Sequence, residues 1–315
     1  MSTHPTTALP PRLTEVAENV FAHVQPPGGW CLSNAGIVVD DGARGNGGNG
    51  GDTVLVDTAA TEGRARRLRE AVLRVAGGPP RTVVNTHFHG DHTFGNFVFP
   101  EAVVVGHENT RTLVAATGLH LTTLWPEVEW GELCLRPPTV TYADRLTLHA
   151  GSLRVELLHV GPAHGTDDTV VWLPERSVLF TGDLTMAGVT PFVPMGSVSG
   201  SLAAVARLRK LGARTVVPGH GPVAGPELLD ATEAYLRWLR ELAAQGLAAG
   251  LTPLELAAEA DLGEYAELLD AERLVPNLHR AYAEERGLAA GEPLDMRLMF
   301  GEMVTHHGGL PACHA

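Results

Sequence analysis

The chain has 315 residues, of which 44% are hydrophobic and 19% charged, proportions typical of a globular enzyme that exclude a disordered chain. Because 36 acidic residues oppose 23 basic ones, the formal net charge of −13 argues against wrapping nucleic acid or lying on an anionic membrane. The three cysteines form no closely spaced pair, and we find neither a signal core nor an apolar run of the roughly 18 residues that span a bilayer. We therefore expect a cytoplasmic protein.

The first part of the chain alternates predicted strands with one clear helix. Apolar, β-branched stretches over 13–24, 30–39, 53–58 and 81–86 predict strands. Residues 61–76 predict an amphipathic helix, because Leu68, Val72 and Val75 recur at helical spacing. The glycine-rich segment 42–52 lacks a GK[ST] signature and a following helix, so we interpret it as a hairpin loop and not as a phosphate-binding loop.

The second part begins β-rich and ends helical. Residues 139–161 predict three short strands, 169–183 a hairpin, 201–211 a helix and 214–221 a strand. Beyond Pro226 the composition shifts to Ala, Leu and Glu, with helical patterns across 227–248, 253–260 and 264–285. We expect an α/β sandwich over 13–225, a helical extension over 226–300 and a flexible tail over 301–315.

A cluster of metal-binding residue types follows the strand over 81–86, in the sequence HFHGDH. Imidazoles two residues apart on an extended segment lie on one side, so His87 and His89 can reach a single cation. Asp91 and His92 fall just past the turn and can serve a neighbouring cation. Packing gives no reason to collect three imidazoles and a carboxylate within six residues, so this motif indicates a metal site.

Three more candidate ligands, His164, Asp183 and His220, each lie at the end of a strand-like run. Taken alone, a histidine beside a glycine is usually an ordinary loop or core residue. The hexapeptide makes all three residues stronger ligand candidates, because α/β folds place functional residues in loops at strand ends. Five imidazoles and two carboxylates, one of them shared, suit two borderline metal ions, for which we expect zinc, with iron or manganese as alternatives.

Over roughly residues 13–225, these motifs resemble the metallo-β-lactamase superfamily. The resemblance implies an αββα sandwich and a ligand set in which His87, His89 and His164 bind one metal, Asp91, His92 and His220 bind the second, and Asp183 bridges them. The two-zinc β-lactamases typically have cysteine near the position of Asp183. An aspartate there is similar to the hydrolase and thioesterase branch.

A narrower resemblance rests on residues 161–202, residues 215–223 and the helical tail. These segments resemble the thioesterase/cyclases of aromatic (type II) polyketide pathways, which close a ring by aldol chemistry and then release the product by thioester hydrolysis. The resemblance implies a partner, either an acyl carrier protein with a tethered polyketide or a small-molecule thioester. Two alternatives stay open: a lactone or glutathione-thioester hydrolase of the same superfamily, and a non-catalytic metal-binding scaffold.

In a hydrolase of this kind Asp91 would orient the attacking hydroxide or accept its proton, and Asp183 would set the spacing of the metals. The loop after Asp183 carries Met186, Phe192 and Met195, which would either line an apolar substrate pocket or pack in the core. The same two interpretations apply to Trp125 and Trp130. Asp167 and Asp168 would either accept the free N–H of His164 or serve as turn residues.

Two other groups of residues have a simpler interpretation. The spacing of His306, His307, Cys313 and His314 suits no closed zinc site, which favours a frayed tail. Five arginines on the helix over 61–76, namely Arg64, Arg66, Arg67, Arg69 and Arg74, would meet an acidic carrier protein or form a solvated face. The second interpretation is favoured.

Overall fold

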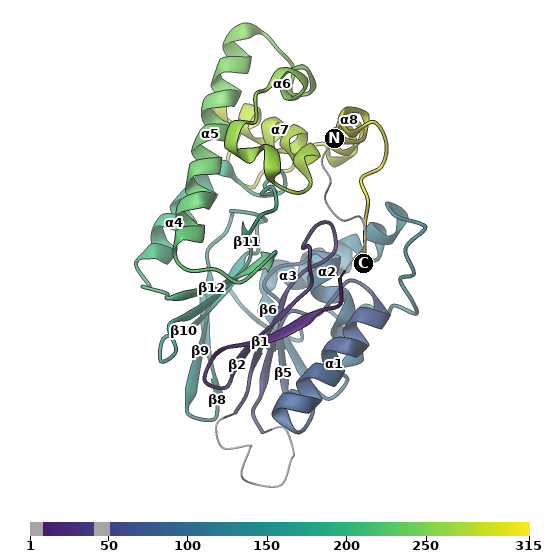
Figure 1. Cartoon of the computed structure of the whole chain (residues 1–315), viewed down its shortest axis with the longest axis vertical. Helices are drawn as coiled ribbons and strands as arrows, with labels where there is room; N and C mark the ends of the chain where they lie inside the picture. The colour runs from purple at the N-terminus through teal and green to yellow at the C-terminus, as the bar shows by residue number, and fades with distance from the viewer. Residues whose placement is uncertain (1–8, 41–50) are drawn as a thin grey trace.

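A computed structural model describes residues 9–40 and 51–315. Within these residues two β-sheets pack face to face, and helices cover the outer face of each sheet (Figure 1). Further helices of the C-terminal third stand at one end of the sandwich. The structure thus confirms the αββα architecture with a helical C-terminal region. No helix in the described ranges is long and apolar enough to cross a membrane.

The first sheet has its strands in sequence order: β1 (Arg12–Ala17), β2 (Val20–Val24), β3 (Ala35–Val38), β4 (Val54–Val56), β5 (Thr82–Val84), β6 (Val103–His107) and β7 (Val140–Tyr142). The strands pair antiparallel up to β4 and parallel from β4 to β7. Helix α1 (Glu62–Ala76) connects β4 to β5 and buries Leu68 and Val72 against Ile37 and Leu55. The Thr61 side chain accepts a hydrogen bond from Arg64 N, which caps the first turn of α1.

The second sheet has the order β12-β11-β10-β9-β8. Its strands are β8 (Arg145–Ala150), β9 (Leu153–His159), β10 (Thr169–Leu173), β11 (Val178–Met186) and β12 (Thr215–His220). Only the β11–β12 pair is parallel in this sheet, and α4 (Val198–Arg209) forms the crossover between the two strands. Leu157, Val171 and Phe180 face the first sheet across the central core.

The C-terminal third consists of α5 (Glu227–Ala249), α6 (Pro253–Glu259), α7 (Leu274–Glu285) and α8 (Met296–His307), with short 3-10 turns η4 (Gly263–Glu267) and η5 (Ala271–Arg273). Between β5 and β7 lie α2 (Gly90–Thr93), η2 (Phe94–Val98), α3 (Glu108–Thr117) and η3 (His120–Thr123). The C-terminal helices and the short elements between β5 and β7 both flank the end of the sandwich at which the predicted ligands lie.

Three predicted elements are interrupted in the structure. The strand expected over 13–24 is a hairpin, because Asn19 adopts a φ of 63° between β1 and β2. The strand expected over 30–39 is shorter in the structure and spans only Ala35–Val38. Cys31 has a φ of 62° and lies in the preceding loop. The helix expected over 264–285 starts at Leu274, which places Pro276 in the first turn, where its missing N–H costs no hydrogen bond.

The range 301–315, expected as a flexible tail, instead contains the last turns of α8 and a segment that returns to the core. Buried Met299 and Met303 anchor α8. Beyond the helix, the Pro311 carbonyl accepts a hydrogen bond from Trp125 Nε1 at 2.7 Å, and the His314 carbonyl accepts one from Arg64. These bonds to side chains of the sandwich give the returning segment a fixed course. The glycine-rich segment 42–52 lies outside the described residues, apart from its last two positions.

Candidate metal centre

The candidate ligands come from both sheets and meet at one end of the sandwich. His87 and His89 lie in the loop after β5, and α2, which follows at once, carries Asp91 and His92. From the second sheet come His164, in the loop before β10, Asp183 in β11, and His220 at the end of β12. The structure therefore brings all seven predicted ligands together between the two sheets.

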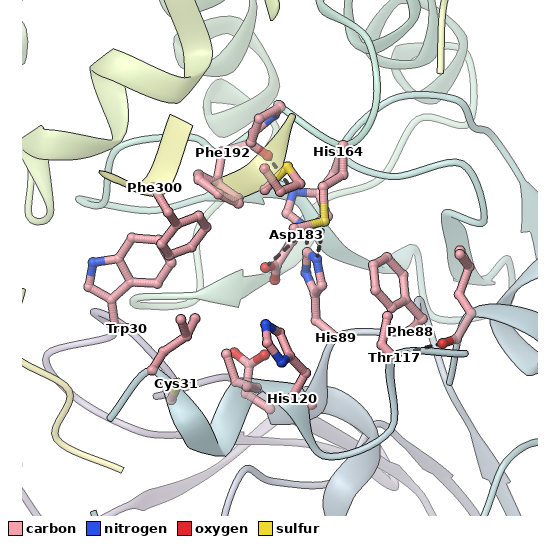
Figure 2. A pocket seen from close by; sticks show the side chains of 18 of the residues that line it. Trp30, Cys31, Phe88, His89, Thr117, His120, His164, Asp183, Phe192 and Phe300 are labelled. Atoms are coloured by element: carbon pink, nitrogen blue, oxygen red, sulfur yellow. Dashed lines mark hydrogen bonds and ion pairs between the residues drawn. The ribbon is translucent and has the colours of Figure 1, made fainter. Parts of the chain in front are cut away.

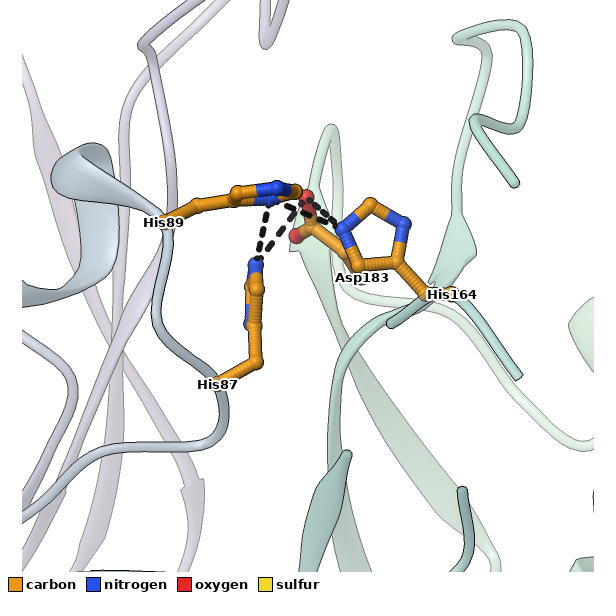
Figure 3. Close-up of side chains that lie close together, drawn as sticks. All are labelled: His87, His89, His164 and Asp183. Carbon is orange, nitrogen blue, oxygen red and sulfur yellow. Dashed lines mark hydrogen bonds and ion pairs between the residues drawn. The ribbon is translucent and has the colours of Figure 1, made fainter. Parts of the chain in front are cut away.

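The first ligand group contains His87, His89, His164 and Asp183 (Figure 3). The nearest ring nitrogens converge: His89 Nδ1 lies 3.0 Å from His87 Nε2 and 3.0 Å from His164 Nε2. Asp183 Oδ2 lies 3.8 Å from His87 Nε2 and 3.6 Å from His164 Nε2. Three imidazoles and one carboxylate thus point their ligand atoms at one small volume, as a tetrahedral metal site requires.

The second group contains Asp91, His92 and His220. Asp91 Oδ2 lies 3.2 Å from His220 Nε2 and 3.7 Å from His92 Nε2. Asp183 also reaches this group, with Oδ1 at 3.1 Å from His92 Nε2 and Oδ2 at 3.4 Å from His220 Nε2. Asp183 is therefore the residue between the two groups, in the position of a shared ligand.

The ring nitrogens that face away from the centre are held by other groups. The carbonyl of Phe192 accepts a hydrogen bond from His164 Nδ1, and the carbonyl of Gly28 accepts one from His220 Nδ1 at 2.9 Å. A carbonyl can only accept, so both rings carry a proton on Nδ1 and direct Nε2 at the centre. This arrangement of a fixed tautomer behind each ligand is usual for metal-binding histidines.

Electrostatics also suit a cation. Burial lowers the pKa of His89 to about 3 and that of His87 well below its ordinary value, so both rings are neutral and can ligate. Burial alone would raise the pKa of Asp91, but neighbouring His92 and His220 hold it at about 2, so the carboxylate is ionised. His92 Nε2 and Asp183 Oδ1 are buried and have no hydrogen-bond partner among the described residues. Buried polar atoms are normally satisfied, and a metal ion between them would supply what is missing.

Asp57 is a supporting residue that the sequence did not reveal. It is buried at the end of β4, and its carboxylate accepts hydrogen bonds from Thr86 N at 2.8 Å, Thr86 Oγ1 at 2.7 Å and His92 Nδ1 at 2.8 Å. Asp57 therefore fixes both the backbone just before His87 and the tautomer of His92. One signal was present, an aspartate directly after the buried strand TVLV, but many turns have the same pattern.

The backbone itself approaches the shared carboxylate. Gly219 precedes His220 in β12, and a Cβ at this position would overlap Asp183 Oδ1. The side chain of Asn34 donates to the carbonyls of Pro218 and Gly221 and so holds this turn from the other side. The sequence PGHG thus combines one ligand with a glycine that makes room for another.

Of the two interpretations of Asp167 and Asp168, that of acceptors for the free N–H of His164 is wrong, because the Phe192 carbonyl accepts that hydrogen bond. The Asp168 carboxylate instead accepts hydrogen bonds from the amides of Ala163 and Gly165, on either side of the ligand. Asp167 accepts from Thr110 Oγ1, and burial together with Asp168 raises its pKa to about 8. Both residues shape the His164 loop and contact no ligand nitrogen.

A cavity of about 760 Å³ opens directly onto the ligands (Figure 2). Met186, Phe192 and Met195 all line it, in the way the pocket interpretation requires. Trp125 and Trp130 do not line it; they pack in the adjoining core, where Trp130 Nε1 donates to the Trp125 carbonyl. Lining residues that sequence reasoning missed include Trp30, Arg273 and Phe300, which are far from the motifs along the chain.

The remaining candidates lie away from the ligands. His306, His307, Cys313 and His314 belong to neither ligand group. On α1, Arg66 pairs with Glu62 and Arg69 with Glu101 at the surface. Arg64 differs, since it is buried and its guanidinium donates to Gln25 Oε1 at 2.8 Å. The solvated-face interpretation therefore fails for Arg64.

Comparison with known proteins covers mainly the sandwich. Residues 28–220, more than half of the chain, match the model of the metallo-beta-lactamase superfamily. A linear primary-alkylsulfatase of Pseudomonas sp. is 27% identical over an alignment of 255 residues that covers 66% of this chain and 48% of the relative, so the chain spans about half of that protein. A metallo-beta-lactamase type 2 of Bacteroides fragilis is 26% identical over 230 residues, or 70% and 83% of the two chains. The solved structure of a metallo-beta-lactamase from Pontibacter korlensis shares the fold, with a TM-score of 0.58, 24% identity and coverage of 72% and 99%.

Proposed function

The chain belongs to the metallo-β-lactamase superfamily, and we propose that it is a dinuclear zinc hydrolase that cleaves the thioester of a bulky, largely apolar acyl group. The acyl group would be an aromatic polyketide intermediate on an acyl carrier protein, or a small-molecule thioester of similar shape. The observation that carries this proposal is the apolar cavity whose floor is the ligand set.

The size and lining of the cavity support a bulky acyl group. A volume of about 760 Å³ lies in the upper part of the range for drug-sized ligands. Besides the ligands, its ionisable lining residues are Cys31, His120, Arg273 and Arg297, and most of the remaining wall is apolar. A small lactone would leave most of this volume unfilled, and the charged groups of glutathione would meet few partners on these walls.

The side chains of the centre suit attack of water on a carbonyl carbon. Metal ions at such a site lower the pKa of water and stabilise negative charge that develops on oxygen. Asp91 is ionised and borders the cavity, so its carboxylate is placed to orient the attacking water and to accept its proton. In the overall reaction the C–S bond breaks, the acyl group leaves as a carboxylic acid and the sulfur leaves as a thiol.

The resemblance to thioesterase/cyclases extends the proposal to ring closure before release. Ring closure passes through an enolate and hydrolysis through an oxyanion, and both develop negative charge on oxygen. One centre that stabilises this charge can therefore serve both steps. The apolar walls would fold the chain of the substrate and keep bulk water away until the ring has closed.

A second candidate is hydrolysis of another ester of an apolar substrate. The name of the alkylsulfatase relative points to a sulfate ester, and the same apolar cavity would hold an alkyl chain. A non-catalytic scaffold, by contrast, would need neither the cavity nor an ionised carboxylate on its floor.

The test is a substrate panel with zinc-loaded protein. The panel contains the 1-naphthoyl and acetyl thioesters of N-acetylcysteamine, dodecyl sulfate and a short N-acyl homoserine lactone. We expect the naphthoyl thioester to have the largest kcat/KM and His89→Ala to abolish the activity. Faster turnover of the lactone or of dodecyl sulfate than of any thioester would overturn the proposal.

A further inference from the structure

The substrate cavity extends well beyond the part of the chain that matches the superfamily. That match ends at residue 220, but Leu294, Met296 and Phe300 of the C-terminal extension line the cavity. We propose that the extension determines acyl selectivity, through an aromatic wall formed by Trp30, Phe192 and Phe300 that holds a planar acyl group beside the metal centre. This inference deepens the proposed function and rests on it for the nature of the scissile bond.

The three rings form one continuous surface (Figure 2). The centroids of Trp30 and Phe192 are 5.4 Å apart at an interplanar angle of 76°, and those of Phe192 and Phe300 are 6.4 Å apart at 78°. Trp30 and Phe300 complete the triangle at 6.2 Å. These separations are typical of aromatic rings in contact, and the mixed edge and face orientations offer both kinds of surface to a further planar ring.

The wall is fixed relative to the metal centre. Phe192 provides a ring to the cavity and, through its carbonyl, the hydrogen-bond acceptor that orients His164. Trp30 is held in place, because its Nε1 donates to Glu272 Oε1 at 2.7 Å and the guanidinium of Arg273 lies 4.1 Å from its ring centroid. An acyl group that packs on these rings is therefore placed at a defined position with respect to the ligands.

Phe300 is the ring most available to a substrate. Trp30 and Phe192 are buried, whereas Phe300 is only half-buried. Helix α8 is also anchored by Met299 and Met303, which are fully buried. Leu298, two positions before it, is 51% exposed and does not line the cavity, which makes it a matched control on the same helix.

The experiment compares Phe300→Ala, Phe300→Tyr and Leu298→Ala in zinc-loaded protein. For Phe300→Ala we expect kcat/KM for the naphthoyl thioester to fall about tenfold and that for the acetyl thioester to change less than twofold, since a lost apolar contact affects only the substrate that makes it. Phe300→Tyr, which keeps the ring, should retain the preference for the naphthoyl thioester, and Leu298→Ala should behave like the wild type. Equal losses on the two thioesters, or no loss, would overturn the inference.

A binding measurement separates this inference from the proposed function. The ligand is the amide analogue of the naphthoyl thioester, in which nitrogen replaces the thioester sulfur. It is titrated calorimetrically into each variant. We expect its dissociation constant to rise about tenfold in Phe300→Ala and to stay unchanged in Leu298→Ala. If the wild type hydrolyses no thioester but this pattern holds, the proposed reaction fails and the aromatic wall stands. If thioesters are hydrolysed but Phe300→Ala binds the amide as the wild type does, the wall fails and the reaction stands.

Discussion

Replacing Asp57 by asparagine tests whether one buried carboxylate sets the position of the proton on His92. The carboxylate accepts three hydrogen bonds, from Thr86 N to Oδ1 and from Thr86 Oγ1 and His92 Nδ1 to Oδ2. An asparagine has a single acceptor oxygen. If that oxygen keeps the bond from Thr86 N, the amide nitrogen takes the place of Oδ2 and donates to His92 Nδ1. The imidazole must then carry its proton on Nε2, the nitrogen that faces Asp91 and Asp183.

The expected losses follow from these contacts. Removing a partner that orients a metal ligand typically weakens metal binding 10–100-fold, which corresponds to about 1.4–2.7 kcal/mol. Each hydrogen bond to a charged group contributes about 1.5–3 kcal/mol, and asparagine can still form one or two of the three. With one or two bonds lost, we therefore expect the metal-free Asp57→Asn protein to lose about 1.5–6 kcal/mol in its free energy of unfolding.

The assay is a zinc titration against a chromophoric chelator, combined with urea unfolding of the metal-free protein. We expect the binding step that involves His92 to weaken about 10–100-fold and the other step to weaken less, because Asp57 bonds His92 directly but reaches His87 only through Thr86. Asp52→Asn is the matched control: its exposed carboxylate lies just before β4 and 3.9 Å from Arg81, away from the ligands. Unchanged zinc affinity in Asp57→Asn, or an equal loss at both steps, would refute the reasoning.

Asp183 contacts both ligand groups, so Asp183→Asn should abolish turnover and lower the zinc content from about two ions per chain, while the metal-free protein melts within a few degrees of the wild type. Elemental analysis that still finds about two zinc ions per chain would speak against a shared ligand. Burial, with a smaller contribution from Arg64, lowers the pKa of His23 from 6.5 to about 4, so the unfolded chain takes up this proton first. The contribution of neutral His23 to the free energy of unfolding is therefore fully present above about pH 6.5 and is lost as the pH falls toward 4. His23→Gln should reduce this loss by up to about 3 kcal/mol in urea unfolding of the metal-free protein. An unaltered pH profile would contradict this. Gly301 lies inside α8 with open space around its Cβ position, so Gly301→Ala should stabilise the protein by about 0.5–1 kcal/mol in the same assay, and a destabilised variant would show that the space is filled.

The sequence predicted which residues meet at the candidate metal centre, because the relevant signals are local. The hexapeptide from His87 to His92 lies close after β5, His164 lies in the loop after β9 and His220 ends β12, whereas Asp183, expected at a strand end, lies within β11. The period of apolar residues then predicted α1 and most strands, since a buried face imposes that period on any amphipathic element.

The walls of the cavity were not predictable in the same way. Trp30 and Phe300 lie 270 positions apart, and no local pattern marks either ring as a neighbour of the other. The segment after α8 was expected to fray because its His and Cys spacing suits no closed zinc site, but its carbonyls accept hydrogen bonds from Trp125 and Arg64. Contacts of this kind depend on tertiary packing, which a single sequence does not display.

The close approach of Gly219 to Asp183 has a consequence for any experiment that scores all single substitutions along the chain. At most candidate ligand positions the damage depends on which residue is introduced, because some replacements retain a metal-donor atom. At position 219 the first side-chain carbon already overlaps the carboxylate, so alanine should be as damaging as a large or charged residue. A flat profile of this type would group Gly219 with the ligands in a mutational map, although it contributes no donor atom to the centre.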